Sequence, residues 1–84
     1  MKVIWTGHAK RRLLEWSKRR GLTQEQVEAV VRSPGQTVLG HADLWVAQSR
    51  VGDGLLRAPF FEVEDGRTIV TVYWTSQIRR YWEV

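Results

Sequence analysis

The dipeptide Pro34-Gly35 separates two parts of the chain that carry different hydrophobic patterns. Proline lacks a backbone N–H and disfavours helical geometry in the residue before it, so a helix is not expected to continue through this point. Before Pro34, apolar residues recur at helical spacing, whereas β-branched and aromatic residues separated by turns follow Gly35. The sequence therefore predicts a helical first part and a stranded second part.

Residues 7–20 are predicted to form the first helix. Thr6 can act as its N-cap by accepting a backbone hydrogen bond, and Gly21 suits the left-handed conformation that commonly ends a helix. Apolar residues at helical spacing provide a stripe that can be buried: Ala9, Leu13 and Trp16, with Leu14 beside them.

A second helix is predicted to begin after Thr23, because Thr23 and Gln26 have the spacing of a capping box. Leu22 and Val27 flank this box at the positions of a hydrophobic staple. The helix is expected to end near Ser33, just before the proline. The two helices would then form a helical hairpin.

Four strands are predicted after Gly35, with glycine-containing turns between them. Pro59 cannot donate a backbone hydrogen bond, so it would make the third of these an edge strand or place a bulge in it. Residues 3–5 can form a further short edge strand. We therefore expect an α+β fold in which an N-terminal helical hairpin packs on an antiparallel β-sheet. The predicted strands are Thr37–Leu39, Leu44–Val51, Leu55–Val63 and Arg67–Thr75.

The length and the absence of cysteine restrict the chemistry. With 84 residues, the chain is expected to form a single domain, residues 1–84. No cysteine is present, which excludes disulfides, thiolate metal sites and cysteine nucleophiles. Nucleotide-binding glycine motifs and zinc-ligand spacings are also absent, and Gly52-Asp53-Gly54 is interpreted as a hairpin turn. We expect neither a cofactor nor a metal.

Apolar runs of the length needed for a membrane span, about 20 residues, are absent. The first residues are too polar beyond Trp5 for a signal peptide. We therefore expect a cytoplasmic protein that does not associate with membranes.

The net charge of +4 and the pI near 10.1 come mostly from arginine. Arginine binds phosphate through paired hydrogen bonds and can stack on bases, so RNA or an acidic protein is the expected partner. A general contribution of this charge to solubility is the alternative.

The first helix carries the densest group of basic residues in the chain. His8, Arg12, Glu15 and Arg19 lie at spacings that place them along one face. This face is either a solvated surface on which Glu15 pairs with Arg11 or Arg19, or an edge that binds phosphate. The second interpretation assigns nucleic-acid binding to Arg11, Arg19 and Arg20 of this helix and to Arg79 near the C-terminus.

His8 lies in the first helical turn, where the helix dipole and the nearby Arg11 and Arg12 disfavour a second positive charge. A neutral imidazole beside arginines can act as a general base toward a ribose 2′-hydroxyl. The alternative is a histidine that only packs and hydrogen-bonds locally. His41 lies in a predicted turn and is assigned no role.

The segment from Thr71 to Trp82 combines aromatic, hydroxyl and basic side chains directly after the last predicted strand. Such a mixture suits stacking on unpaired bases together with contacts to the phosphate backbone. Most of the tryptophans are expected in the core because a domain of this size needs their buried area. The residues kept as functional candidates are Arg79, Arg80 and Tyr81.

Three separated segments carry a resemblance to a known family: His8-Ala9 with Arg12, then Arg20-Gly21-Leu22-Thr23 with Val27 and Pro34, and finally Val70–Ser76 with Arg80-Tyr81-Trp82. They resemble a small prokaryotic family of unknown function that is grouped with the RelE/ParE toxins. The resemblance implies a helical hairpin on an antiparallel sheet and an mRNA endonuclease toxin, either free or linked to the ribosome. Every lysine lies at or before Lys18, so the sheet lysines of RelE-like nucleases have no counterpart.

Three functional hypotheses follow. The first is a metal-independent endoribonuclease with His8 as base, Arg12 and either Arg79 or Arg80 at the phosphate, and Tyr81 positioning a base or donating a proton. The second is a non-catalytic module of the same fold that binds RNA or protein. The third is a ParE-like inhibitor of a protein target. An acidic antitoxin is an expected partner of the toxin.

Overall fold

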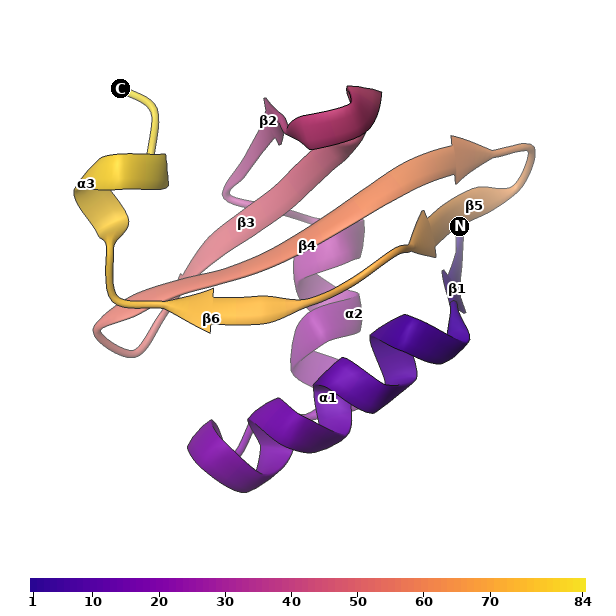
Figure 1. Cartoon of the computed structure of the whole chain (residues 1–84). Helices are drawn as coiled ribbons and strands as arrows, with labels where there is room; N and C mark the ends of the chain where they lie inside the picture. The colour runs from indigo at the N-terminus through magenta and orange to yellow at the C-terminus, as the bar shows by residue number, and fades with distance from the viewer.

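The computed structural model describes residues 1–84 as an α+β fold with three helices and a mixed six-stranded sheet (Figure 1). A single 3₁₀ turn at His41–Asp43 joins two of the strands. No helix is both long and apolar enough to cross a membrane. In chain order the elements are β1 (Lys2–Trp5), α1 (Gly7–Arg20), α2 (Gln24–Arg32), β2 (Gln36–Leu39), β3 (Trp45–Val51), β4 (Gly54–Val63), β5 (Gly66–Ile69), β6 (Tyr73–Thr75) and α3 (Ile78–Tyr81).

The first two helices begin and end where their capping residues predict. The Thr6 hydroxyl accepts a hydrogen bond from the backbone N–H of Ala9 at 3.1 Å. Gly21 has a φ of 69°, the left-handed conformation that ends α1. Both hydrogen bonds of the capping box between Thr23 and Gln26 are present at the start of α2. These local predictions are confirmed.

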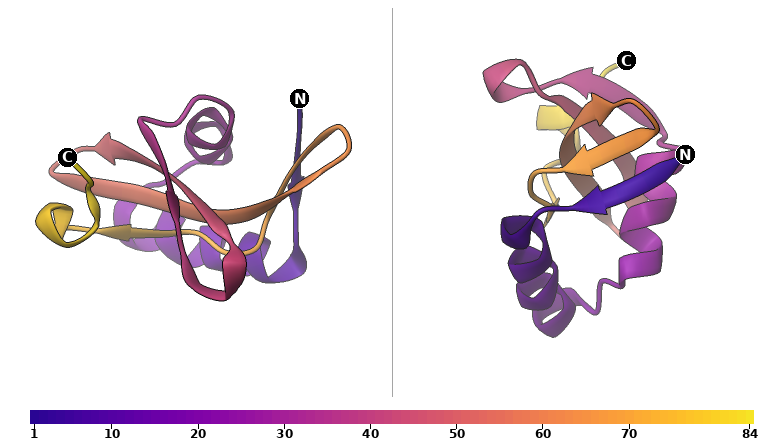
Figure 2. Two further views of the ribbon diagram at one scale, coloured as in Figure 1. Left: turned by 90° about the horizontal axis from the view of Figure 1, so that it is seen from above. Right: turned by 90° about the vertical axis from the view of Figure 1, so that its right-hand side faces the viewer.

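The sheet has the strand order β1-β5-β4-β3-β2, and β6 pairs with the first part of β4. The prediction of an antiparallel sheet is wrong at β1, because β1 runs parallel to β5, from Lys2 opposite Gly66 to Trp5 opposite Ile69 (Figure 2). Only the pairing of β1 departs from an antiparallel arrangement. Both helices and three strands separate β1 from β5 along the chain, so no hairpin turn constrains their relative direction.

Pro59 lies in β4, which is a central strand, so the prediction that it marks an edge strand is wrong. The bulge lies in the neighbouring strand instead. Residues 70–72 lie opposite only residues 58–59 of β4, and this extra residue divides the predicted last strand into β5 and β6. The Pro59 carbonyl still accepts a hydrogen bond from Val70 N–H at 2.9 Å. The irregular segment thus faces the position where proline has no N–H to offer.

The hydrophobic core lies between one face of the sheet and the helices α1 and α2. In Figure 2 these two helices diverge from the short loop that joins them. Buried side chains of both helices and of the sheet form one hydrophobic cluster. Only two of the five tryptophans, Trp16 and Trp74, are buried in this core, so the prediction that most of them would be buried is wrong. Trp5 and Trp82 are half-buried, and Trp45, the first residue of β3, is 42% exposed.

The opposite face of the sheet is partly covered by α3 and the C-terminal residues. The sequence analysis did not predict α3, which has four residues and no side-chain cap. The Gln36 side chain holds the end of the chain, since its amide nitrogen donates to the Glu83 carbonyl and its oxygen accepts from Glu83 N–H at 3.1 Å. These contacts fix the C-terminal segment against the edge strand β2.

We predict that Gly66→Ala disrupts the parallel pairing, because a Cβ at this position would lie 2.2 Å from the Lys2 carbonyl oxygen. Overpacking of this kind costs roughly 1–3 kcal/mol, and a backbone clash should lie at the upper end. Gly7→Ala is the matched control, since its nearest neighbour is the Arg11 Nη1 atom at 3.6 Å. Urea unfolding and amide exchange in β1 provide the measurement. Unchanged stability and protection in Gly66→Ala would contradict the pairing.

Candidate functional site

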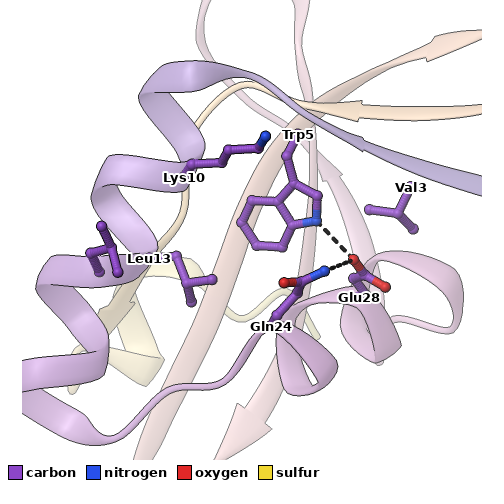
Figure 3. A pocket seen from close by; sticks show the side chains of 7 residues that line it. Val3, Trp5, Lys10, Leu13, Gln24 and Glu28 are labelled. Atoms are coloured by element: carbon purple, nitrogen blue, oxygen red, sulfur yellow. Dashed lines mark hydrogen bonds between the residues drawn. The ribbon is translucent and has the colours of Figure 1, made fainter.

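The molecule has three pockets of similar volume, and two of them lie on opposite faces of the sheet. The remaining one, of about 480 Å³, is a shallow surface at residues 76–80. The first lies between α1, α2 and β1, has a volume of about 520 Å³ and is shown in Figure 3. Its polar groups already bind one another, since the Trp5 indole N–H donates to Glu28 at 2.8 Å and the Gln24 amide donates to the same carboxylate at 2.9 Å. These contacts connect β1 with α2 and give this pocket a structural role.

The Glu28 carboxylate is held in its ionised form by its neighbours. The hydrogen bond from Trp5 is the main cause that lowers the pKa of Glu28, and the bond from Gln24 adds to it. Partial burial acts in the opposite direction, and Arg32, 3.4 Å away, lowers the pKa further. Glu28 therefore serves as the anionic end of a contact between elements.

The second pocket lies on the sheet face opposite α1 and α2, between the β2–β3 loop, β4, residues 71–73 and α3. Its volume is about 550 Å³. We call it the arginine pocket, after Arg57 in its lining. Its polar lining consists of His41, Arg57, Thr71, Tyr73, Arg80, Tyr81 and Glu83.

Arg57 is a buried cation without a carboxylate partner. It is 7% exposed, and none of the ion pairs in the structure involves it. Its Nε donates to the Gln48 side-chain oxygen at 2.7 Å, and its Nη1 donates to the Tyr73 hydroxyl. Buried charges in proteins are usually paired with an opposite charge. The positive charge of Arg57 therefore remains uncompensated beside an open pocket, which suits the binding of an anion.

Gln48 fixes the orientation of this arginine. Its side chain is fully buried, and its amide nitrogen donates to Gln36 at 2.8 Å and to the Tyr81 carbonyl at 3.0 Å. The amide oxygen is therefore directed toward Arg57. Hydrogen bonds join four side chains on the neighbouring strands β2, β3, β4 and β6 into one row, Gln36–Gln48–Arg57–Tyr73. The bond from Gln48 to the Tyr81 carbonyl connects this row with α3. A fully bonded buried network of this type is rigid.

Two tyrosine rings enclose the Arg57 guanidinium. Its Cζ lies 4.0 Å from the centre of the Tyr81 ring, and the rings of Tyr73 and Tyr81 meet edge to face at 6.4 Å. Burial raises the pKa of Tyr73 above its ordinary value, and the positive charge of Arg57 acts in the opposite direction. Tyr73 therefore keeps its phenolic proton at neutral pH and can donate it.

His41 and Arg80 line the same pocket from two further elements. The turn that carries His41 is strained, because Ala42 and Asp43 have φ values of 55° and 60°, which non-glycine residues rarely adopt. A hydrogen bond from Gly40 N–H to the Leu44 carbonyl closes this loop at 2.8 Å. The strained turn holds the imidazole at the pocket, although the sequence analysis assigned it no role.

The structure brings together only part of the catalytic set predicted from the sequence. Arg80 and Tyr81 lie on α3 at the arginine pocket. His8 and Arg12 lie on α1, on the other side of the sheet, and neither lines the pocket (Figure 1). Arg12 forms an ion pair with Glu15 at 2.6 Å. Glu15 thus pairs with Arg12, whereas the sequence suggested Arg11 or Arg19.

The predicted nucleic-acid-binding arginines lie in different surroundings. Arg19 stacks on Trp16 with its Cζ 4.4 Å from the ring centre, and Arg20 stacks on Trp74 at 3.6 Å. These two arginines contribute to packing around α1. Arg11 is exposed on α1, and Arg79 is exposed on α3 beside the pocket.

Sequence analysis missed Arg57, Gln48 and Tyr73. One signal was available, since Arg57 interrupts an apolar strand of leucine, alanine, proline and phenylalanine. A charged residue at the centre of such a strand is expected either to disrupt it or to be held by partners. Which residues would provide that support depends on the strand register.

Comparison with protein-family models, with curated proteins and with solved structures found no match to the chain. No group of three or more histidine, aspartate or glutamate side chains lies close enough to hold a metal ion. The titratable groups that line the arginine pocket are its two arginines, one histidine, two phenols and the Glu83 carboxylate, which forms no ion pair with Arg57.

We predict that Gln48→Leu destabilises the protein by about 1–3 kcal/mol, because Arg57 would lose a buried hydrogen-bond acceptor. Thermal unfolding should detect this as a lower Tm. The matched control is Gln77→Leu at the exposed start of α3, which should change stability by less than about 0.5 kcal/mol. Equal Tm values for the two variants would mean that the network does not hold Arg57.

We predict that Glu28→Gln makes the protein less stable at neutral pH, and that the difference from wild type disappears in acid. A lowered folded-state pKa stabilises the fold only above the unfolded-state value, about 4.3 for glutamate. This contribution is lost as the pH falls through the folded-state pKa. Urea unfolding between neutral pH and about pH 3 measures it, and parallel profiles for the two proteins would refute it.

Proposed function

We propose that this protein is a metal-independent endoribonuclease of the RelE/ParE toxin-like kind, and that the arginine pocket is its active site. The observation that carries the proposal is Arg57, a buried guanidinium that has only neutral partners and lines an open pocket. Such a group binds an anion more strongly than an exposed arginine does, because little water competes for it.

The surroundings of Arg57 favour RNA over other anions. Tyr73 and Tyr81 offer aromatic faces on which unpaired bases can stack, and Arg80 adds a second cation for the phosphate backbone. Two cations beside aromatic rings match a nucleotide, which has a charged backbone and a flat base. The net positive charge of the chain also favours the binding of RNA.

The pocket residues provide the groups needed for cleavage by transesterification. The His41 imidazole removes the proton of the ribose 2′-hydroxyl, and the resulting oxygen attacks the adjacent phosphorus. The bond from phosphorus to the 5′-oxygen breaks, and this oxygen takes a proton from the Tyr73 phenol. The products are a 2′,3′-cyclic phosphate and a 5′-hydroxyl, while Arg57 and Arg80 stabilise the charge on the phosphate.

This assignment changes three parts of the hypothesis drawn from the sequence. The general base is His41 in place of His8, Arg57 takes the place of Arg12 at the phosphate, and Tyr73 donates the proton. Arg80 keeps its role at the phosphate, and Tyr81 keeps its role in positioning a nucleobase. The resemblance of the chain to RelE/ParE toxins supports the same class of activity. It also makes the ribosome and an acidic antitoxin the partners to be tested first.

The decisive experiment compares the two histidines. Single-stranded RNA is incubated with wild type, His41→Ala and His8→Ala in the presence of a metal chelator. We expect His41→Ala to lose about 10²–10⁴ in rate with little change in RNA affinity, because a general base contributes mainly to the transition state. His8→Ala should cleave as wild type does. If only His8→Ala loses cleavage, the general base is His8 on α1 and not His41.

A second experiment tests the anion site without removing the arginine. Gln48→Glu places a carboxylate where Arg57 now has a neutral partner, so it should weaken RNA binding at least about tenfold. Wild-type affinity should also fall as salt is added. Binding that depends on Arg57 without any cleavage would favour the non-catalytic module. Absence of RNA binding would favour a protein target.

A further inference from the structure

The sheet face that carries the arginine pocket continues past it as an exposed apolar surface. Side chains alternate along β4, so Phe61 and Val63 lie on the same face as Arg57. Phe61 is 44% exposed and Val63 is 38% exposed. A single exposed apolar side chain is ordinary, whereas a contiguous group of them marks a surface that can bind a partner.

The register of the sheet extends this surface across two more strands. Phe61 lies opposite Thr68 of β5, and Thr68 lies opposite Ile4 of β1, so the three side chains form one row. Ile4 is 42% exposed. Thr68, at the centre of the row, is only 8% exposed, so the accessible part of the row consists of the Phe61 and Ile4 side chains on either side of it. The helices α1 and α2 pack on the other face of the sheet.

Cations lie at both ends of this surface. Lys2 is exposed and lies two residues before Ile4, on the same face of β1. Arg57 lies four residues from Phe61 along β4, which corresponds to about 13 Å in an extended strand. Glu62 faces the helices, and the acidic residues Glu64 and Asp65 lie in the turn beyond Val63. Lys2 lies beside this turn, since its backbone N–H donates to the Asp65 carbonyl at 2.9 Å. The order of groups is therefore a cation, an aromatic and apolar surface, and a second cation next to two carboxylates.

We propose that Phe61 and Ile4 form a second base-binding subsite for single-stranded RNA, continuous with the arginine pocket. This inference rests on the proposed function. With one phosphate bound at Arg57, the strand runs along β4, a neighbouring base stacks on the Phe61 ring, and Lys2 contacts a more distant phosphate. The two flanking cations favour a polyanion over an apolar protein segment.

The subsite predicts that affinity depends on RNA length. We expect wild type to bind a hexanucleotide more tightly than a dinucleotide, because only the longer strand reaches Phe61. Phe61→Ala should weaken hexanucleotide binding about tenfold and leave dinucleotide binding unchanged. Phe61→Trp should retain the tight binding. Isothermal titration measures both ligands, and a non-hydrolysable 2′-O-methyl backbone prevents cleavage during the experiment.

Controls separate this inference from the proposed function. Leu14→Ala removes an apolar side chain of α1 that is 64% exposed, more than Phe61, and should change neither affinity. Lys2→Glu should weaken only the hexanucleotide. If the hexanucleotide binds Phe61→Ala and wild type equally, the subsite is refuted while the arginine pocket stands. If the wild type binds neither ligand, the proposed function fails as well.

Discussion

The structure around the arginine pocket depends on one constraint, the burial of the Arg57 guanidinium without an opposite charge. Desolvating such a cation is costly, so its N–H groups need acceptors in fixed positions. Gln48 provides one acceptor from β3 and Tyr73 provides another from β6. Because Gln48 also binds the Tyr81 carbonyl, the short helix α3 is held in place by the same requirement. The arginine thus organises one whole face of the sheet.

Two segments of irregular backbone, the bulge at residues 70–72 and the turn after His41, lie at this pocket. The bulge at residues 70–72 brings Thr71 into the lining, and it lies opposite Pro59, which also lines the pocket. The left-handed residues Ala42 and Asp43 follow His41 directly. Left-handed residues other than glycine cost stability and persist when the surrounding contacts impose them. Irregular backbone thus lies at two places around this pocket, the His41 turn and the bulge.

The two faces of the sheet carry different kinds of side chains. The face toward α1 and α2 holds the dry core, in which Phe60 and Ile69 are fully buried. The other face carries the polar network and the exposed Phe61. Alternation along a single strand, β4, therefore assigns neighbouring residues to the core and to the opposite face. A domain of 84 residues thus maintains a core on one face of the sheet and keeps part of the other face exposed.

The sequence alone determined the elements, because their signals are local. Thr6 and Gly21 delimit α1, and the capping box at Thr23 starts α2, through contacts between residues no more than four positions apart. The parallel pairing of β1, the burial of Arg57 and the separation of His8 from Tyr81 were decided only by the tertiary structure. Each depends on which strands become neighbours and in which register, and that is set by packing between residues far apart in the chain.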